Sequence, residues 1–179
     1  MHRASRAHAT DTPPPRLKTE WRATVMPAGK QLSGFAAGTV IDTTDGPMPV
    51  EALMAGDMLL TTEGAPMPLR AVSSALCRNA TVVRLALDTF ERNGTARELL
   101  VGPAQTLKLD NGRPCSRFLG PALTPAAELI CARGVRLEAV AEIRLYQLHC
   151  DARAVIHAQG VDAVIRPLCA DLPAKTRLH

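Results

Sequence analysis

The sequence predicts an all-β fold, and three features of its pattern lead to this prediction. From Gly34 onward, short apolar runs are broken every eight to twelve residues by turn signals. Many of these turns consist of a polar residue followed by glycine, which supplies the positive φ that tight hairpins need. Only two short segments have helical spacing. The pattern is therefore typical of a series of antiparallel hairpins with one or two short helices.

The expected strands follow one another with clear turns between them. In the first half they are 39–43, 58–62, 68–76 and 81–88, with turns at Asp45-Gly46 and Glu63-Gly64 and a polar break before 81–88. In the second half they are 98–101, 106–109, 135–150 and 154–161, with turns at Asn93-Gly94, Asp110-Asn111-Gly112 and Gln159-Gly160. Each turn joins neighbours that can pair as a hairpin.

The two expected helical pieces are residues 50–57 and 124–130. In the first, Val50, Leu53 and Met54 recur at i, i+3 and i+4, and the helix is expected to close at Gly56. In the second, Thr124 is expected to be the N-cap and Pro125 the first helical residue.

Composition divides the 179 residues into three parts. Residues 1–33, with three consecutive prolines and the only tryptophan, are expected to form a flexible basic arm, in which 17–26 has enough alternation to add a short edge strand. Residues 34–168 form the β domain, and 169–179 a C-terminal tail. Because aromatic residues are only 3% of the chain, the core must consist of aliphatic side chains.

The net charge argues against nucleic-acid binding by the domain. Six basic and two acidic residues precede Gly34, which leaves 15 of the 21 basic and 15 of the 17 acidic residues in 34–179. The β domain is therefore neutral, whereas a nucleic-acid-binding surface carries its excess positive charge on the fold. We expect no nucleic-acid partner.

Hydropathy gives an expectation for localisation. The chain has no run of 18 apolar residues, and its first 16 residues lack the apolar segment of a signal peptide. We expect a soluble protein without a membrane partner, retained in the cytoplasm unless another route exports it.

The cysteines predict neither disulfides nor a metal centre. There are five, an odd number, and no two of them form a C-x-x-C pair. Buried reduced thiols are the expectation, and we expect no metal and no cofactor.

Three blocks of the sequence resemble a known family. They are GFAAGTVIDTTDGPMPVEALMAGDMLLTTEGAPMPLR (34–70), RELLVGPAQTLKL (97–109) and YQLHCDARAVIHAQGV (146–161). In this order they resemble the Hint domain, the fold of hedgehog autoprocessing domains and inteins, and in particular bacterial stand-alone Hint-domain proteins. The resemblance implies a pseudo-twofold β horseshoe made of short hairpins.

The resemblance also implies a site for backbone cleavage, in which the first domain residue attacks the preceding carbonyl with a thiol or hydroxyl group. At that position this chain has Gly34, which has no side chain. Ser33 is the nearest hydroxyl, but it is displaced by one residue. Where the family has a histidine, this chain has Gln105, followed by Thr106. An amide does not titrate near neutral pH, so Gln105 is expected to bond a backbone carbonyl and hold its turn.

The third block holds the one cluster of reactive side chains, which consists of His149, Cys150, Asp151 and His157. On a strand, His149 and Asp151 point to one face and Cys150 to the other, so a joint site would need a bulge. No asparagine follows Gly160 to cyclise, as the release step of inteins requires.

Three functions follow as hypotheses. The first is a degenerate Hint domain that has lost autoprocessing and acts as a structural or protein-binding module. The second is a self-cleaving protein that uses the unusual groups Ser33, Thr39 and Cys150. The third is an adaptor that contacts a protein partner through the arm between Pro13 and Trp21. Exposed sheet edges could also bind a partner or pair two copies, and the oligomeric state stays open.

Overall fold

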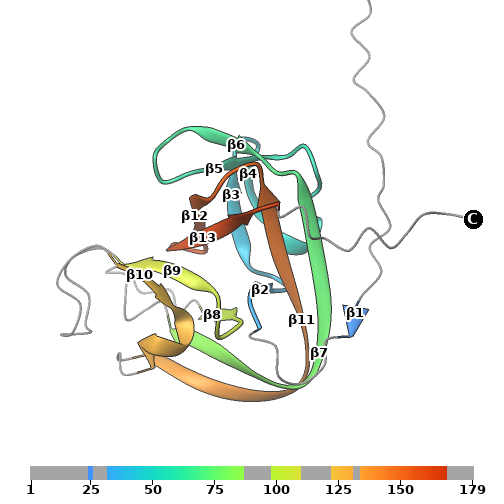
Figure 1. Cartoon of the computed structure of the whole chain (residues 1–179), viewed down its shortest axis with the longest axis vertical. Helices are drawn as coiled ribbons and strands as arrows, with labels where there is room; N and C mark the ends of the chain where they lie inside the picture. The colour runs from blue at the N-terminus through green and yellow to red at the C-terminus, as the bar shows by residue number, and fades with distance from the viewer. Residues whose placement is uncertain (1–23, 26–31, 87–97, 110–121, 131–133, 169–179) are drawn as a thin grey trace, which may run out of the picture.

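Two long antiparallel strands form the backbone of the fold (Figure 1). The computed structural model describes residues 24–25, 32–86, 98–109, 122–130 and 134–168. Strand β7 (Ala71–Ala86) pairs with β11 (Val135–Cys150) from Ala71 opposite His149 to Leu85 opposite Val135. This ladder connects the two ends of the molecule.

Within the described residues, short strands and two 3₁₀ helices surround the long pair. The other strands are β1 (Thr24–Val25), β2 (Phe35–Ala36), β3 (Val40–Thr43), β4 (Gly46–Pro49), β5 (Met58–Leu60), β6 (Pro66–Pro68), β8 (Glu98–Val101), β9 (Thr106–Leu109), β10 (Ala122–Pro125), β12 (Ala154–Ala158) and β13 (Val161–Pro167). The helices are η1 (Val50–Ala52) and η3 (Ala126–Leu129). In the part of the chain that the structure describes, no helix has the length and apolar character needed to cross a membrane.

Most of the strands expected from the sequence are present, and the all-β prediction is confirmed. Strand β11 has the predicted bounds 135–150. The Gln159-Gly160 turn joins β12 to β13 with positive φ at both residues (51° and 84°), as a two-residue hairpin requires. Thr24–Val25 forms the short edge strand expected within 17–26 and pairs with β7. The expected turns at Asn93-Gly94 and Asp110-Asn111-Gly112 lie outside the described residues.

Three local predictions are wrong. The polar break expected between 68–76 and 81–88 does not end the strand, because β7 continues through it with β11 paired opposite. Within this stretch Asn79 adopts a positive φ of 48°. The helix expected over 50–57 is a 3₁₀ turn, since Leu53 already has an extended ψ of 142°. Thr124 is not an N-cap, because it lies in β10 opposite Leu107. Helix η3 begins at Ala126, one residue after the predicted start at Pro125.

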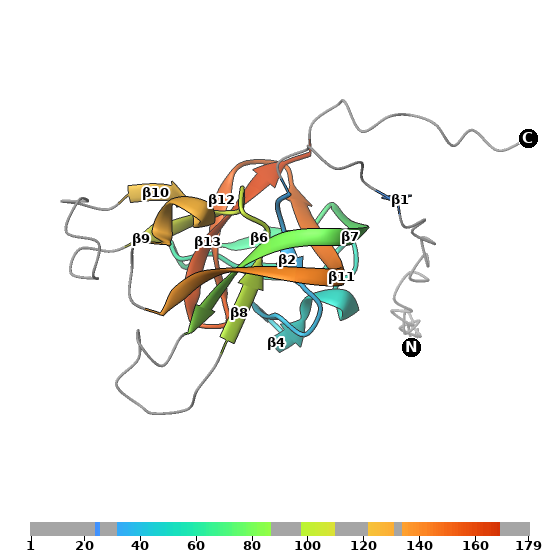
Figure 2. The same ribbon diagram turned by 90° about the horizontal axis from the view of Figure 1, so that it is seen from below.

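Apart from Phe35, the core of the described residues is aliphatic, in line with the low aromatic content. Its largest fully buried side chains are Phe35, Ile41, Leu59, Leu69, Leu85, Leu99, Leu107 and Ile156. Phe35 belongs to β2, which lies between β8 and β11 and pairs opposite Val101 and Tyr146. Seen from below, β8 continues the sheet beside β7 (Figure 2). Residues that immediately precede β2 therefore enter the middle of the sheet.

Leu99→Ala should destabilise the fold by about 2–5 kcal/mol, because it removes a side chain with no exposed surface and leaves a cavity. Leu137→Ala is the matched control, since Leu137 is 48% exposed, and its effect should stay within about 0.5 kcal/mol. Urea unfolding followed by circular dichroism measures both. Equal losses for the two variants would contradict the assignment of the core.

Candidate functional site

The segment 32–34 enters the sheet through close backbone contacts. The amide of Ala104 donates to the carbonyl of Leu32 at 2.8 Å, and the amide of Gly102 donates to the carbonyl of Gly34 at 2.9 Å. A Cβ atom on Gly102 would lie 2.5 Å from the Leu32 oxygen. Only glycine allows this approach, so Gly102 positions the segment.

Gly34 occupies a position that excludes a side chain. Its φ is +115°, a conformation that residues with a Cβ rarely adopt. A Cβ built there would lie 2.4 Å from the backbone oxygen of Tyr146. Since that oxygen belongs to β11, it cannot move aside as the end of a flexible side chain could. A cysteine or serine at position 34 would require a different backbone.

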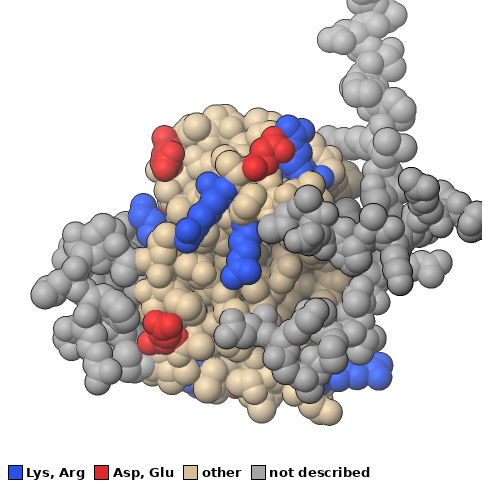
Figure 3. Space-filling view, viewed as in Figure 1, with Lys and Arg blue, Asp and Glu red and all other residues tan. Residues whose placement is uncertain are grey.

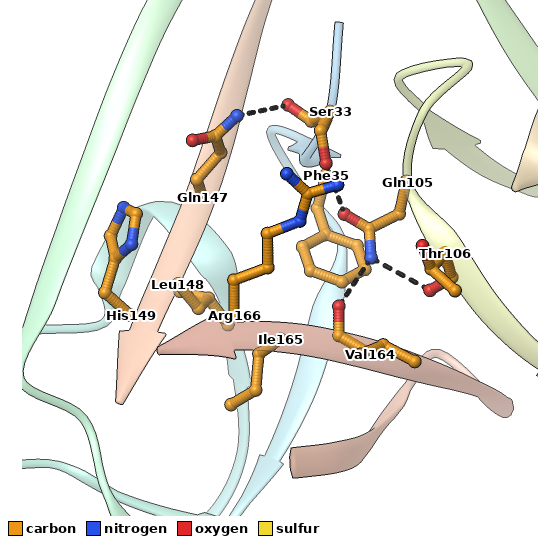
Figure 4. A pocket seen from close by; sticks show the side chains of 10 residues that line it. All are labelled: Ser33, Phe35, Gln105, Thr106, Gln147, Leu148, His149, Val164, Ile165 and Arg166. Carbon is orange, nitrogen blue, oxygen red and sulfur yellow. Dashed lines mark hydrogen bonds between the residues drawn. The ribbon is translucent and has the colours of Figure 1, made fainter. Parts of the chain in front are cut away.

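Gln105 binds the peptide bond between Ser33 and Gly34. Its Oε1 accepts the amide of Gly34 at 3.1 Å and the hydroxyl of Ser33 at 3.2 Å. Its Nε2 donates to the carbonyls of Val164 at 2.9 Å and Thr106 at 3.1 Å (Figure 4). The side chain is only 4% exposed and its hydrogen-bonding capacity is fully used. The expectation that Gln105 bonds a backbone carbonyl is confirmed, while Thr106 contributes its carbonyl.

A second glutamine binds the other side of the same peptide bond. Gln147 Nε2 donates to the carbonyl of Ser33 at 3.1 Å. The Ser33–Gly34 peptide is thus bonded at its N–H by Gln105 and at its C=O by Gln147. The two amides can orient and polarise this peptide, but they cannot move a proton near neutral pH.

Sequence reasoning missed Gln147, although it lies in the third block next to Tyr146. The antiparallel register places Phe35 opposite Tyr146, so Gln147 comes opposite Gly34. That register joins residues more than one hundred positions apart. Gln147 could have been identified only from the pairing of β2 with β11, which the sequence does not reveal.

The cluster of the third block does not form one site. Cys150 is fully buried, and its neighbours point to other partners. His149 Nε2 lies 2.9 Å from Ser73 Oγ, and burial lowers the pKa of His149. Asp151 forms an exposed ion pair with Arg70, whose hydrogen bonds hold the pKa of the carboxyl group below its ordinary value. Strand β11 ends at Cys150, and Asp151 lies in the bend that follows it, so the alternation of faces expected for a strand does not extend to Asp151.

His157 lies in β12, and its partner is Asp162 of β13 rather than any member of the cluster. Its Nδ1 is 2.7 Å from Asp162 Oδ1, opposite it in the β12–β13 register. Among the residues that the structure describes, no group of three or more His, Cys, Asp or Glu side chains lies close enough to hold a metal ion.

Comparison with known families agrees with this geometry. The family model described as "Hint domain" matches residues 33–163. The chain belongs to the Hint-domain family. The resemblance of the three sequence blocks is thereby confirmed, and so is the Hint-like fold.

Solved structures support the same fold. The bacterial intein-like domain from Clostridium thermocellum is 16% identical, with a TM-score of 0.50 over 75% of this chain and 99% of that one. The TvoVMA intein is 10% identical, with a TM-score of 0.53 over 74% of this chain and 96% of that one. At such identities the likeness shows the fold alone. No curated protein matches the chain.

Gly34→Ala should destabilise this Hint domain more than Gly38→Ala. Both glycines have positive φ, which costs alanine about 1–2 kcal/mol, but a Cβ on Gly38 meets no atom within 4 Å. The contact with the Tyr146 oxygen should add about 1–3 kcal/mol at position 34. Urea unfolding of the two variants measures the difference. Equal stability would show that the backbone at Gly34 adapts freely.

Cys150 should resist alkylation in the folded protein. Burial raises its pKa to about 11, so only about a thousandth of the thiol is thiolate at pH 8. Iodoacetamide treatment followed by peptide mass spectrometry should therefore leave Cys150 unmodified in buffer and modify it in urea. Cys77, which is also buried, should behave alike. Alkylation of Cys150 at equal rates in both conditions would contradict its burial.

Proposed function

We propose that this Hint domain does not cleave its own backbone and acts as a structural or protein-binding module. The observation that carries the proposal is Gly34. It occupies the position of the family's nucleophile, and both its φ and the contact of a Cβ with the Tyr146 oxygen disfavour any side chain there. Without a nucleophile, an amide cannot be converted into an ester or thioester.

The surroundings of Ser33 support the same conclusion. To cleave, its hydroxyl would have to lose a proton and attack the carbonyl of Leu32. The hydroxyl instead donates to Gln105 Oε1, an amide oxygen that is too weak a base to accept a proton. The Leu32 carbonyl does accept the amide of Ala104, but polarisation without a base leaves the hydroxyl protonated.

The other groups of the self-cleaving alternative are inaccessible. Thr39 is 3% exposed, and Cys150 has no exposed surface. Burial also raises the pKa of Cys150, which keeps its thiol protonated and unreactive. No base is bonded to either side chain among the contacts of the described residues.

Sheet edges favour a binding role over a purely structural one. Among the described strands, β6 pairs only with β5, and β10 only with β9. An edge strand with unpaired backbone groups can accept a strand from a partner protein. Strand β1, in the N-terminal arm, pairs with the edge of β7. The arm is therefore a second segment through which a partner protein could bind.

Purified protein incubated with dithiothreitol or hydroxylamine should keep its full mass. Neither reagent has an ester or thioester to cleave, so intact-mass spectrometry should show no fragment that begins at Ser33 or Gly34. Gly34→Cys should also stay whole, because the new side chain cannot fit the native backbone and Gln105 supplies no proton.

A fragment from the unchanged protein would overturn the proposal. Loss of that fragment on Ser33→Ala would then identify Ser33 as the nucleophile and favour the self-cleaving alternative. Thr106→Ala is the control, since the contribution of Thr106 to the Gln105 network is its backbone carbonyl, which the substitution retains.

A further inference from the structure

A small pocket opens beside the Ser33–Gly34 peptide (Figure 4). Its volume is about 40 Å³, enough for a few water molecules or one small polar group. Phe35, Leu148 and Ile165 give it an apolar floor, and each of these side chains is at least 97% buried. Its polar lining residues are Ser33, Gln105, Thr106, Gln147, His149 and Arg166. Burial lowers the pKa of His149, so Arg166 is the cation of the pocket.

Arg166 brings a positive charge to this pocket. It is an exposed residue of β13, and its side chain extends toward Ser33 and Gln105 in Figure 4. None of the residues that line the pocket is acidic. Arg70, Arg78 and Arg84 each pair with a carboxylate, whereas no ion pair joins Arg166 to any described residue.

The charge distribution around the pocket favours an anion. Basic side chains project from the middle of the face that carries β12 and β13, and acidic side chains lie nearer its margins (Figure 3). A guanidinium presents two parallel N–H donors, the geometry that a carboxylate accepts. Gln147, which also lines the pocket, has two amide hydrogens and gives one of them to Ser33, so the second is left to donate to a ligand.

We propose that this pocket binds a small carboxylate group. The guanidinium of Arg166 pairs with the two oxygens, Gln147 donates to one of them, and a short aliphatic end contacts Phe35 and Leu148. A doubly charged oxyanion such as phosphate fits less well, because the pocket has one cation and an apolar floor. The inference rests on the proposed binding role and gives that role a ligand class.

The carboxylate has two sources, a free short-chain acid or the C-terminus of a peptide. Titration of the ¹⁵N-labelled full chain distinguishes them, with the Gln147 side-chain amide and the Arg166 Nε–H as NMR probes at constant ionic strength. The ligands are sodium acetate, tetra-alanine with a free C-terminus, and the same peptide as its C-terminal amide. Sodium phosphate is the comparison anion.

Acetate or the free peptide should shift both probes in a saturable way, with a dissociation constant of about 1 mM or weaker. Arg166→Gln should weaken binding at least tenfold, and Arg166→Lys by less, since lysine keeps the charge but loses the paired donors. Arg136→Gln, an exposed substitution near the start of β11, is the matched control and should change binding less than twofold.

Binding of both ligands supports a general carboxylate site, and binding of the free peptide alone assigns the site to chain termini. The inference is overturned if no ligand shifts the probes, if phosphate binds more tightly, or if the amidated peptide binds equally well. Equal weakening by Arg136→Gln would also overturn it. None of these results depends on backbone cleavage, which intact-mass spectrometry tests separately.

Discussion

The pairing of β7 with β11 is the constraint on which the other parts of the molecule depend. The two sixteen-residue strands keep one register along their whole length. Because the side-chain period of a strand is two, a slip of one residue would exchange its buried and exposed faces. The same strand β11 also pairs with β2 and with β13. Its register therefore decides which side chains meet the segment 32–34.

Charged side chains reinforce this register across three strands. Arg84 of β7 bonds Glu138 of β11 on one side and Glu98 of β8 on the other. The hydrogen bonds of Arg84 lower the pKa of the Glu138 carboxyl group, so the pair stays charged over the physiological range. Glu138 lies opposite Val82, two positions along the ladder from the pair of Arg84 and Arg136. If β7 and β11 paired in a shifted register, Arg84 would be separated from its two glutamates. The ion pairs of Arg84 therefore favour the observed register.

The sequence predicted what depends on neighbouring residues and missed what depends on pairing. Glycine after a polar residue correctly located the turn that ends at Gly160, because positive φ is a local requirement. The continuity of β7 through Asn79 could not be read in the same way, since a polar stretch is stable in a strand only when its partner is present. Gln147 and Arg166 were missed for that reason, while Gly34 and Gln105 were found because a family motif fixed their order.

The two glutamines and the glycine form one mutually dependent arrangement. Gln105 can accept the Gly34 amide because φ at Gly34 turns that amide toward it, and this φ is accessible because no Cβ meets the Tyr146 oxygen. The oxygen is held in turn by the pairing of β11 on both sides. A cysteine at position 34 would have to rotate the backbone, which would break the bond to Gln105.

If the domain is inactive as proposed, a single substitution would not be enough to introduce cleavage chemistry at position 34. The nucleophile, the backbone that presents it and a titrating group at position 105 would have to change together. Gln105 is buried and donates to two carbonyls, and a histidine there has one fewer hydrogen to offer when neutral. It would leave at least one carbonyl without its donor, at a cost of about 1–3 kcal/mol. The arrangement around Gly34 is stable because each of its parts fits the others.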